Sequence, residues 1–221
     1  MVRIYPSLIG GNLICLENDI QLLENHCAGF HCDVMDFHFV PNQTLSPAMV
    51  NAIRAAVVNQ LWVHLMVEDP VRYIERMNLK HKDIVSIHCE IKGDVAAVLA
   101  DIKSRGLLAS LAINPTTPLE ALIPYVSTVD HILLMTVNPG FSGQSFIKNS
   151  YERLKTLTSW RKERELSFVI GVDGGINGEN IGELVREGAI DIAVASAIFG
   201  ATDPVHALED LQKTADLAQN Q

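Results

Sequence analysis

Short apolar runs of β-type composition alternate with amphipathic segments along the whole chain. The apolar runs fall at 3–8, 29–35, 61–66, 84–88, 107–113, 131–137, 167–172 and 191–195. Segments with helical periodicity follow them at 16–23, 47–56, 70–77, 94–105, 119–126, 151–164, 179–187 and 205–218. Strands that alternate with helices in this way form a parallel sheet with right-handed crossovers. Eight such pairs in 221 residues predict an α/β fold, a closed (β/α)8 TIM barrel.

A doubly wound open sheet is the alternative that the same alternation allows. That fold usually has fewer strands and a glycine-rich turn after the first strand. The turn here, PSLIGGNL at 6–13, does not match the pattern G-x-G-x-x-G. No linker, low-complexity tract or charged tail marks a second domain, and 48% hydrophobic residues can form a sizeable core. We therefore predict that residues 1–221 form a single barrel domain.

Composition and charge limit the binding partners that the protein can have and indicate its cellular compartment. The formal net charge of −9, from 17 basic and 26 acidic residues, disfavours a nucleic-acid partner, which requires clustered positive charge. No apolar run approaches the roughly 20 residues of a membrane-spanning helix. The four cysteines have no CxxC spacing, and no long apolar segment precedes a cleavage site at the N-terminus. These features predict a cytoplasmic protein with reduced cysteines that contacts neither nucleic acid nor membrane. They do not exclude a small-molecule substrate.

The stretch HCDVMDFHF at 31–39 places polar side chains on an otherwise apolar strand. His31, Asp33 and Met35 share one face of this strand because successive side chains alternate, while Cys32 and Val34 should face the helices. An unpaired buried charge costs several kcal/mol. The charge on this strand must therefore be compensated by a metal, a partner charge or a substrate.

Other polar residues lie near the carboxyl ends of the predicted strands, where barrel enzymes carry their chemistry. These residues are Ser7, His31, Asp33, His64, His88, Asn114 and Asp173. His31, Asp33, His64 and Asp173 could offer two nitrogen and two oxygen ligands to Zn²⁺, Fe²⁺, Mn²⁺ or Co²⁺. A lone histidine on a strand is more often a core residue than a ligand, but four candidates at one end of the barrel favour a metal site.

Three methionines lie near these candidate residues in the predicted barrel. Met35 and Met66 each lie two residues after a candidate ligand, and Met135 lies on the sixth strand. These side chains could fill the core, or form a dry lining that protects a carbanion-like intermediate from water. Glycines cluster in PGFSGQSF at 139–146, in DGG at 173–175 and in ASAIFG at 195–200. Loops after the last barrel strands often bind phosphate through backbone N–H groups, so these loops predict a phosphate site.

Six motifs in order and spacing resemble the ribulose-phosphate 3-epimerase family over nearly the whole chain. They are PSL at 6–8, HCDVMDFHFVPN at 31–42, HLMVEDP at 64–70, INPTTPLE at 113–120, MTVNPGFSGQSFI at 135–147 and VDGGINGENI at 172–181. The resemblance implies a metal-dependent isomerase, a carbohydrate-phosphate 3-epimerase. Its expected reaction interconverts D-ribulose 5-phosphate and D-xylulose 5-phosphate in the pentose phosphate pathway, and a homo-oligomer is the family expectation.

The resemblance also implies a role for each matching residue. His31, Asp33, His64 and Asp173 would hold the metal, and the two aspartates would be the catalytic acid-base pair, working through a cis-enediolate. The expected substrate contacts are Ser7, Met35, His64, Met66 and Met135. The expected phosphate contacts are Gly140, Gly143, Gln144, Gly174, Gly175, Ala195 and Ser196.

Two departures from the family pattern and three alternatives stay open. Phe37 and Ala195 stand where the family typically has glycine. D-Allulose-6-phosphate 3-epimerases share the catalytic positions and resemble TLSP at 44–47 and WRKERELSF at 160–168, whereas VDGGIN favours the pentulose phosphate. Decarboxylases and aldolases on related barrels carry D-x-K-x-x-D, but Met35 replaces that lysine here. A non-catalytic sugar-phosphate-binding relative is disfavoured by four intact ligand positions, although Phe37 keeps it open.

Overall fold

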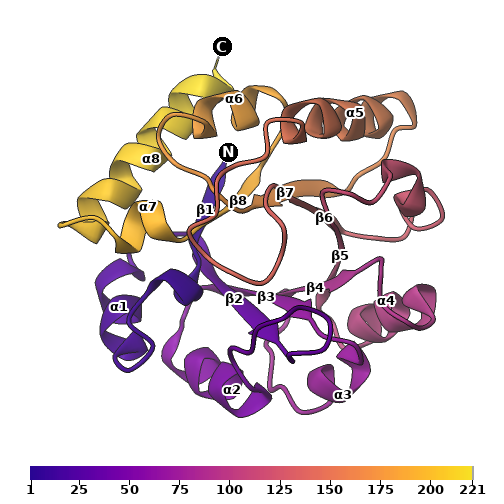
Figure 1. Ribbon diagram of the computed structural model, residues 1–221, viewed down its shortest axis with the longest axis horizontal. Helices are drawn as coiled ribbons and strands as arrows, with labels where there is room; N and C mark the ends of the chain where they lie inside the picture. Colours follow the sequence, from indigo (N-terminus) through magenta and orange to yellow (C-terminus); the bar gives the residue numbers. More distant parts are fainter. Residues whose placement is uncertain (221) are drawn as a thin grey trace.

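The computed structural model describes residues 1–220 and forms a ring of eight parallel strands (Figure 1). The strands are β1 (Arg3–Pro6), β2 (Gly29–Met35), β3 (Gln60–Met66), β4 (Ile84–His88), β5 (Leu108–Ile113), β6 (His131–Met135), β7 (Val169–Asp173) and β8 (Asp191–Val194). From β2 onward each strand pairs in parallel with the next, and β1 pairs with β8. A parallel bridge between Ser7 and His31 closes the ring between β1 and β2. The predicted (β/α)8 barrel is confirmed, and the open sheet is excluded.

Helices surround the ring (Figure 1). They are α1 (Leu16–Leu23), α2 (Pro47–Ala56), α3 (Pro70–Ile74), α4 (Val95–Ser104), α5 (Ser150–Glu163), α6 (Ile181–Arg186), α7 (Ser196–Phe199) and α8 (Pro204–Gln219), with 3₁₀ turns η1 (Leu8–Gly10) and η2 (Leu119–Leu122). Apolar side chains of the helices and strands pack together in one large core. Cys32 and Val34 are buried in this core, as their alternation predicted. None of the helices in residues 1–220 is long and apolar enough to cross a membrane.

Proline accounts for the one predicted helix that does not form. The helix expected over 119–126 is only the short 3₁₀ turn η2, followed by turns. Pro124 lies in the middle of that segment, where it lacks an N–H and its ring clashes with the preceding helical turn. Where proline falls at the first helical position it favours a helix, as at Pro47 of α2 and Pro204 of α8. The apolar periodicity of 119–126 was therefore misleading.

A chain of hydrogen bonds crosses the interior of the barrel near the amino ends of its strands. The indole of Trp62 donates to the hydroxyl of Ser86 at 2.8 Å, and Ser86 donates to Ser110 at 2.7 Å. Ser110 then contacts Nδ1 of His131 at 2.7 Å. All four side chains are buried, so these bonds replace the water that each polar group loses on folding.

An ion pair completes this interior layer. Arg3 donates two hydrogen bonds to the fully buried carboxylate of Asp191, at 2.6 and 2.7 Å. Asp191 also faces Nε2 of His131 at 3.5 Å. The six residues Arg3, Trp62, Ser86, Ser110, His131 and Asp191 are called the floor cluster below.

Candidate metal centre and adjoining cavity

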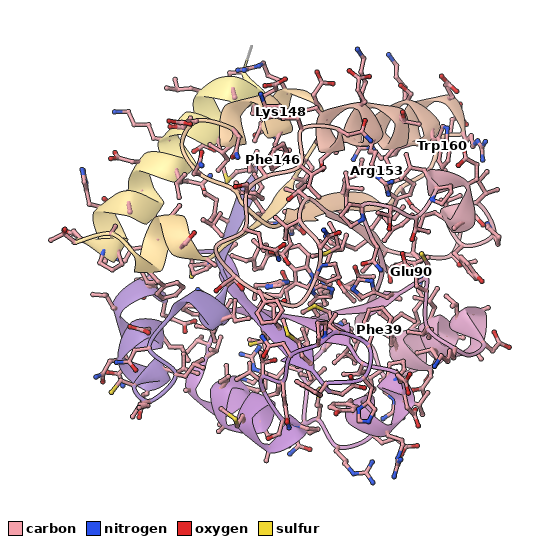
Figure 2. The ribbon with its side chains drawn as sticks, in the orientation of Figure 1. Phe39, Glu90, Phe146, Lys148, Arg153 and Trp160 are labelled. Atoms are coloured by element: carbon pink, nitrogen blue, oxygen red, sulfur yellow. The ribbon has the colours of Figure 1, made fainter. Side chains whose placement is uncertain are left out.

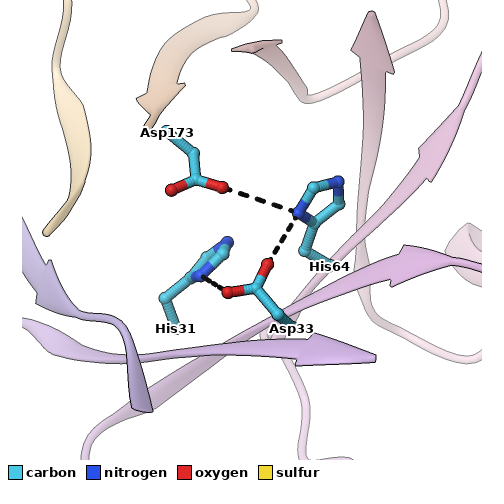
Figure 3. Close-up of side chains that lie close together, drawn as sticks. All are labelled: His31, Asp33, His64 and Asp173. Carbon is cyan, nitrogen blue, oxygen red and sulfur yellow. Dashed lines mark hydrogen bonds and ion pairs between the residues drawn. The ribbon is translucent and has the colours of Figure 1, made fainter. Parts of the chain in front are cut away.

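Four acidic and imidazole side chains meet inside the barrel at the carboxyl ends of three strands (Figure 3). The alternation of β2 turns both His31 and Asp33 inward, β3 supplies His64, and β7 ends at Asp173. One ligand atom from each of the four lies within 4.8 Å of all the others. These are the four residues that the sequence predicts as metal ligands, and they are called the mouth cluster below.

Hydrogen bonds fix Asp33 between two imidazoles. Its Oδ1 lies 3.0 Å from Nδ1 of His64, and its Oδ2 accepts the hydroxyl of Ser7 at 2.9 Å. The oxygen of Ser7 also contacts Nδ1 of His31 at 3.1 Å. Because the single hydroxyl proton of Ser7 goes to Asp33, Nδ1 of His31 carries a proton and donates it to Ser7. A neutral His31 therefore has its lone pair on Nε2.

The residues present fit a divalent cation. Nε2 of His31 is buried and has no hydrogen-bond partner among residues 1–220. In the same range, Asp33 and Asp173 form ion pairs only with histidines and not with lysine or arginine. The buried carboxylate of Asp33 and the largely buried one of Asp173, with an unpartnered imidazole nitrogen, are a donor set suited to a borderline metal. A cation here would offset negative charge that the surrounding chain leaves uncompensated.

The electrostatic environment separates the two aspartates. Burial alone would raise the pKa of Asp33, but the charges and hydrogen bonds of His31 and His64 outweigh it and hold this pKa far below the usual range. Burial and the charge of Asp33 raise the pKa of Asp173. Burial lowers the pKa of His31, yet the two carboxylates outweigh burial and raise it. The mouth cluster therefore holds one strongly ionised carboxylate and one that accepts a proton more readily.

A cavity opens beside the mouth cluster. All the site residues predicted from the sequence line it, except the fully buried His31 and His64. Its walls include the buried thioethers of Met35, Met66 and Met135, so these side chains face the cavity as well as the core. Ile9 and Phe141 also line it, and neither carries a polar group that the sequence could have singled out.

The glycine-rich loops form one end of this cavity, where close packing requires glycine at two positions. Gly174 has φ 119°, and a Cβ there would lie 2.3 Å from a methyl group of Val137. Gly175 has φ 66°, and a Cβ there would lie 2.7 Å from the backbone nitrogen of Phe146. The loop after β7 and the loop after β6 therefore pack backbone to backbone beside the cavity.

The two departures from the family pattern have different settings. Phe37 adopts φ 64°, a left-handed conformation that glycine takes without strain, and its side chain is 65% exposed. Among residues 1–220 it is not part of the cavity wall. Ala195 does line the cavity, just before α7. The larger side chain at position 37 thus points to solvent, and only the change at position 195 adjoins the ligand space.

Sequence reasoning missed one carboxylate behind the mouth cluster. His88 ends β4, and its Nε2 lies 2.8 Å from Nε2 of His64. Glu90 follows two residues later and contacts Nδ1 of His88 at 3.1 Å. The H-x-E spacing of His88 and Glu90 repeats the H-x-D spacing of His31 and Asp33, which is the signal that could have identified Glu90.

The fold and the site define a closed (β/α)8 barrel whose carboxyl-end face carries two histidines and two aspartates that could hold a metal ion, beside glycine-rich loops. The model of the ribulose-phosphate 3 epimerase family matches residues 3–199. The chain therefore belongs to the ribulose-phosphate 3 epimerase family, and the expected class of enzyme, an isomerase that acts as an epimerase, is confirmed.

Individual relatives agree with this assignment. The chain is 36% identical over 214 residues to a ribulose-phosphate 3-epimerase of Bacillus subtilis, covering 96% of this chain and 99% of that one. It is 40% identical over 204 residues to a ribulose-phosphate 3-epimerase of Aquifex aeolicus, covering 92% of each. A thiamine phosphate pyrophosphorylase from Pyrococcus furiosus matches the structure with a TM-score of 0.67 at 16% identity, covering 98% of this chain and 96% of that one. That last likeness shows the shared fold.

Proposed function

We propose that this chain interconverts D-ribulose 5-phosphate and D-xylulose 5-phosphate, with residues 1–221 as one catalytic domain. The observation that carries the proposal is the pair Asp33 and Asp173. The two carboxylates converge from β2 and β7 at the cavity, and both line it. Inverting a carbon next to a ketone requires a proton to leave one face and another to arrive on the opposite face, which two positioned carboxylates can do.

The unequal pKa values of the two aspartates support a division of work. Asp33 is ionised and can accept the C3 proton of a bound ketose phosphate, whereas Asp173 has a raised pKa and can donate a proton to the opposite face. In the reverse reaction their roles exchange. The sugar passes through a cis-enediolate between the two transfers, so negative charge develops on its C2 and C3 oxygens.

The mouth cluster would also hold a divalent ion, Zn²⁺, Fe²⁺, Mn²⁺ or Co²⁺, through His31, Asp33, His64 and Asp173. Such an ion supplies positive charge where the sugar oxygens become negative. The unpartnered Nε2 of His31 supports this assignment. Ser7 contributes by fixing Asp33 and orienting His31.

The remainder of the cavity suits the rest of the substrate. Met35, Met66 and Met135 offer surfaces that cannot donate a proton to an enediolate. At the other end, the predicted phosphate contacts Gly140, Gly143, Gln144, Gly174, Gly175, Ala195 and Ser196 all line the cavity. Backbone N–H groups in such loops bind phosphate, and holding this remote group would orient C3 between the aspartates.

The test compares D-ribulose 5-phosphate with D-allulose 6-phosphate on metal-replete protein. We would measure deuterium entry from solvent at C3 together with product formation for both sugars. Faster exchange and turnover of the pentulose phosphate would support the proposal, and preference for the hexulose phosphate would replace it with the allulose reaction. Absence of exchange with either sugar would favour a binding protein. Removal of metal with a chelator should abolish exchange, and re-addition of each of the four ions should identify the effective one.

Three further expectations stay predictions. They are a cytoplasmic location, assembly into a homo-oligomer and a place in the pentose phosphate pathway.

A further inference from the structure

A row of three side chains, the buried His64 and His88 and the partly exposed Glu90, extends from the mouth cluster to the loop after β4. Nε2 of His64 lies 2.8 Å from Nε2 of His88, and Nδ1 of His88 lies 3.1 Å from Oε2 of Glu90. Both imidazoles are fully buried and their rings are stacked with an interplanar angle of 25°. Only one proton can lie between the two facing nitrogens, so the state of His88 decides the state of His64.

Glu90, which is labelled in Figure 2, lies at the end of this row and is held there by hydrogen bonds. Its Oε1 accepts the backbone N–H of Asn114 at 2.8 Å. Arg153 of α5 secures the same segment by donating to the carbonyls of Asn114 at 3.0 Å and of Pro115 and Thr117 at 2.8 Å. Burial raises the pKa of Glu90, but its hydrogen bonds outweigh burial and lower the pKa to about 2. Glu90 is therefore a fixed carboxylate that can only accept hydrogen bonds.

The carboxylates at the two ends of the row limit which imidazole nitrogens of His64 and His88 can carry protons. Asp33 and Glu90 can both only accept hydrogen bonds. A buried imidazolium is costly, so His64 and His88 are both neutral and carry two protons between them, one of which lies between the facing Nε2 atoms. Without metal, Nδ1 of His64 carries the other proton and donates it to Asp33 Oδ1 at 3.0 Å. A metal at the mouth cluster requires an unprotonated Nδ1 on His64, so Nδ1 of His88 then carries the proton and donates it to Glu90 at 3.1 Å.

We propose that Glu90 is a positioning residue that acts through His88 to set the tautomer of His64, so that Nδ1 of His64 faces the mouth cluster as a metal donor. This inference rests on the proposed metal site. It assigns to Glu90 a role that requires no contact with metal or sugar. Outer carboxylates that orient a ligand imidazole typically change metal affinity by about 10- to 100-fold when they are replaced.

Glu90→Gln is the decisive substitution because it preserves shape and reverses the hydrogen-bonding pattern. The backbone N–H of Asn114 would attract the carbonyl oxygen of the new side chain, which turns its NH₂ group toward Nδ1 of His88. His88 would then carry its proton on Nε2, and His64 would carry its proton on Nδ1, inside the mouth cluster. We expect Zn²⁺ and Co²⁺ affinity to fall by about 10- to 100-fold.

Two readouts that need no sugar test this inference. Competition with a chromophoric chelator gives the Zn²⁺ affinity, and ¹⁵N shifts of histidine imidazoles in the metal-loaded protein report which nitrogen of His64 is protonated. Glu90→Asp, which keeps an acceptor, should recover part of the affinity. Glu68→Gln is the matched control, because Glu68 pairs with Lys92 at the surface and should leave both readouts unchanged.

The outcomes separate the two proposals. If the unmodified protein fails to bind Zn²⁺ or Co²⁺, both the metal site and the role of Glu90 are overturned. If the unmodified protein binds metal and Glu90→Gln has the same affinity and the same His64 tautomer, only the role of Glu90 is overturned. Thermal melts of each metal-free variant distinguish a local change from unfolding, and Glu90→Asp carries the test if Glu90→Gln does not fold.

Discussion

The mouth cluster and the floor cluster both place histidine and aspartate inside the same barrel, yet they differ in charge balance. In the floor cluster, the carboxylate of Asp191 receives two hydrogen bonds from the guanidinium of Arg3. In the mouth cluster, Asp33 and Asp173 have only histidines as ion-pair partners within residues 1–220. The floor cluster satisfies its own charge, whereas the mouth cluster leaves negative charge for something else to offset.

The position of each cluster matches this difference. The floor cluster lies near the amino ends of the strands, where a barrel uses its residues for stability, and the mouth cluster lies at the carboxyl ends beside the cavity. Residue type alone therefore does not distinguish the two clusters. The two clusters are distinguished by their location along the strands and by the absence, among residues 1–220, of an arginine or lysine paired with the mouth cluster. Substitutions in each cluster should therefore affect different properties.

The largest effect should follow loss of a mouth carboxylate. Asp33→Asn and Asp173→Asn should each lower kcat by about 10³-fold or more, because each removes one of the two groups that move the C3 proton. Both variants should remain folded, but Asp33→Asn should lower the unfolding midpoint, because a carboxylate whose pKa is held below its usual range stabilises the fold, whereas Asp173→Asn should not lower it. Steady-state kinetics and thermal melts check this. Full activity in both variants would refute the two-base mechanism.

A floor substitution should affect stability and spare the chemistry. Asp191→Asn removes the charged acceptor of Arg3, which is 40% exposed and keeps contact with water, so the free energy of unfolding should fall by about 2 to 3 kcal/mol. Metal affinity should be unchanged, because the floor cluster shares no residue with the mouth cluster. Urea denaturation and Zn²⁺ titration check the two expectations. A variant that loses metal but not stability would reverse the assignment of the two clusters.

The pH dependence of that difference has a definite sign. Burial raises the pKa of Asp191, but His131 and Arg3 outweigh burial and lower it. A carboxylate whose folded pKa lies below its unfolded value, about 3.9, contributes stability above that value and loses it as the pH falls through the folded pKa. The stability gap between the unmodified protein and Asp191→Asn should therefore be full at neutral pH and shrink below about pH 4.

The alternation of strands and helices made the barrel predictable, and the H-x-D spacing made β2 predictable as a source of two ligands. The floor cluster was not predictable, because Ser86, Ser110 and His131 are brought together by register between strands, which the sequence does not display. The role of Glu90 depends likewise on hydrogen bonds to a neighbouring loop. The helix that does not form at 119–126 shows that Pro124 outweighs the apolar periodicity of that segment.

A smaller effect should come from filling space beside the floor cluster. A Cβ at Gly171 would lie 2.5 Å from the ring of His131 and 2.7 Å from the ring of Trp62. Gly171→Ala should therefore cost about 2 kcal/mol of stability through overpacking, with kcat largely retained. Gly93→Ala is the control, because a Cβ there meets nothing within 4 Å. Equal stability of the two variants in urea denaturation would show that the floor adapts more easily than its packing suggests.

The smallest effect compares backbone strain at the two ends of the barrel. Phe37, in the loop after β2, and Lys82, in the turn before β4, adopt φ values of 64° and 69°. Glycine relieves left-handed strain but loses more entropy on folding, so Phe37→Gly and Lys82→Gly should each raise the free energy of unfolding by only about 0.5 to 1 kcal/mol. Because Phe37 is 65% exposed and outside the cavity wall formed by the described residues, kcat/KM should change less than about twofold in either variant. A change in the preference between pentulose and hexulose phosphates in Phe37→Gly, absent from Lys82→Gly, would instead place Phe37 at the substrate and extend the functional surface beyond the mouth cluster.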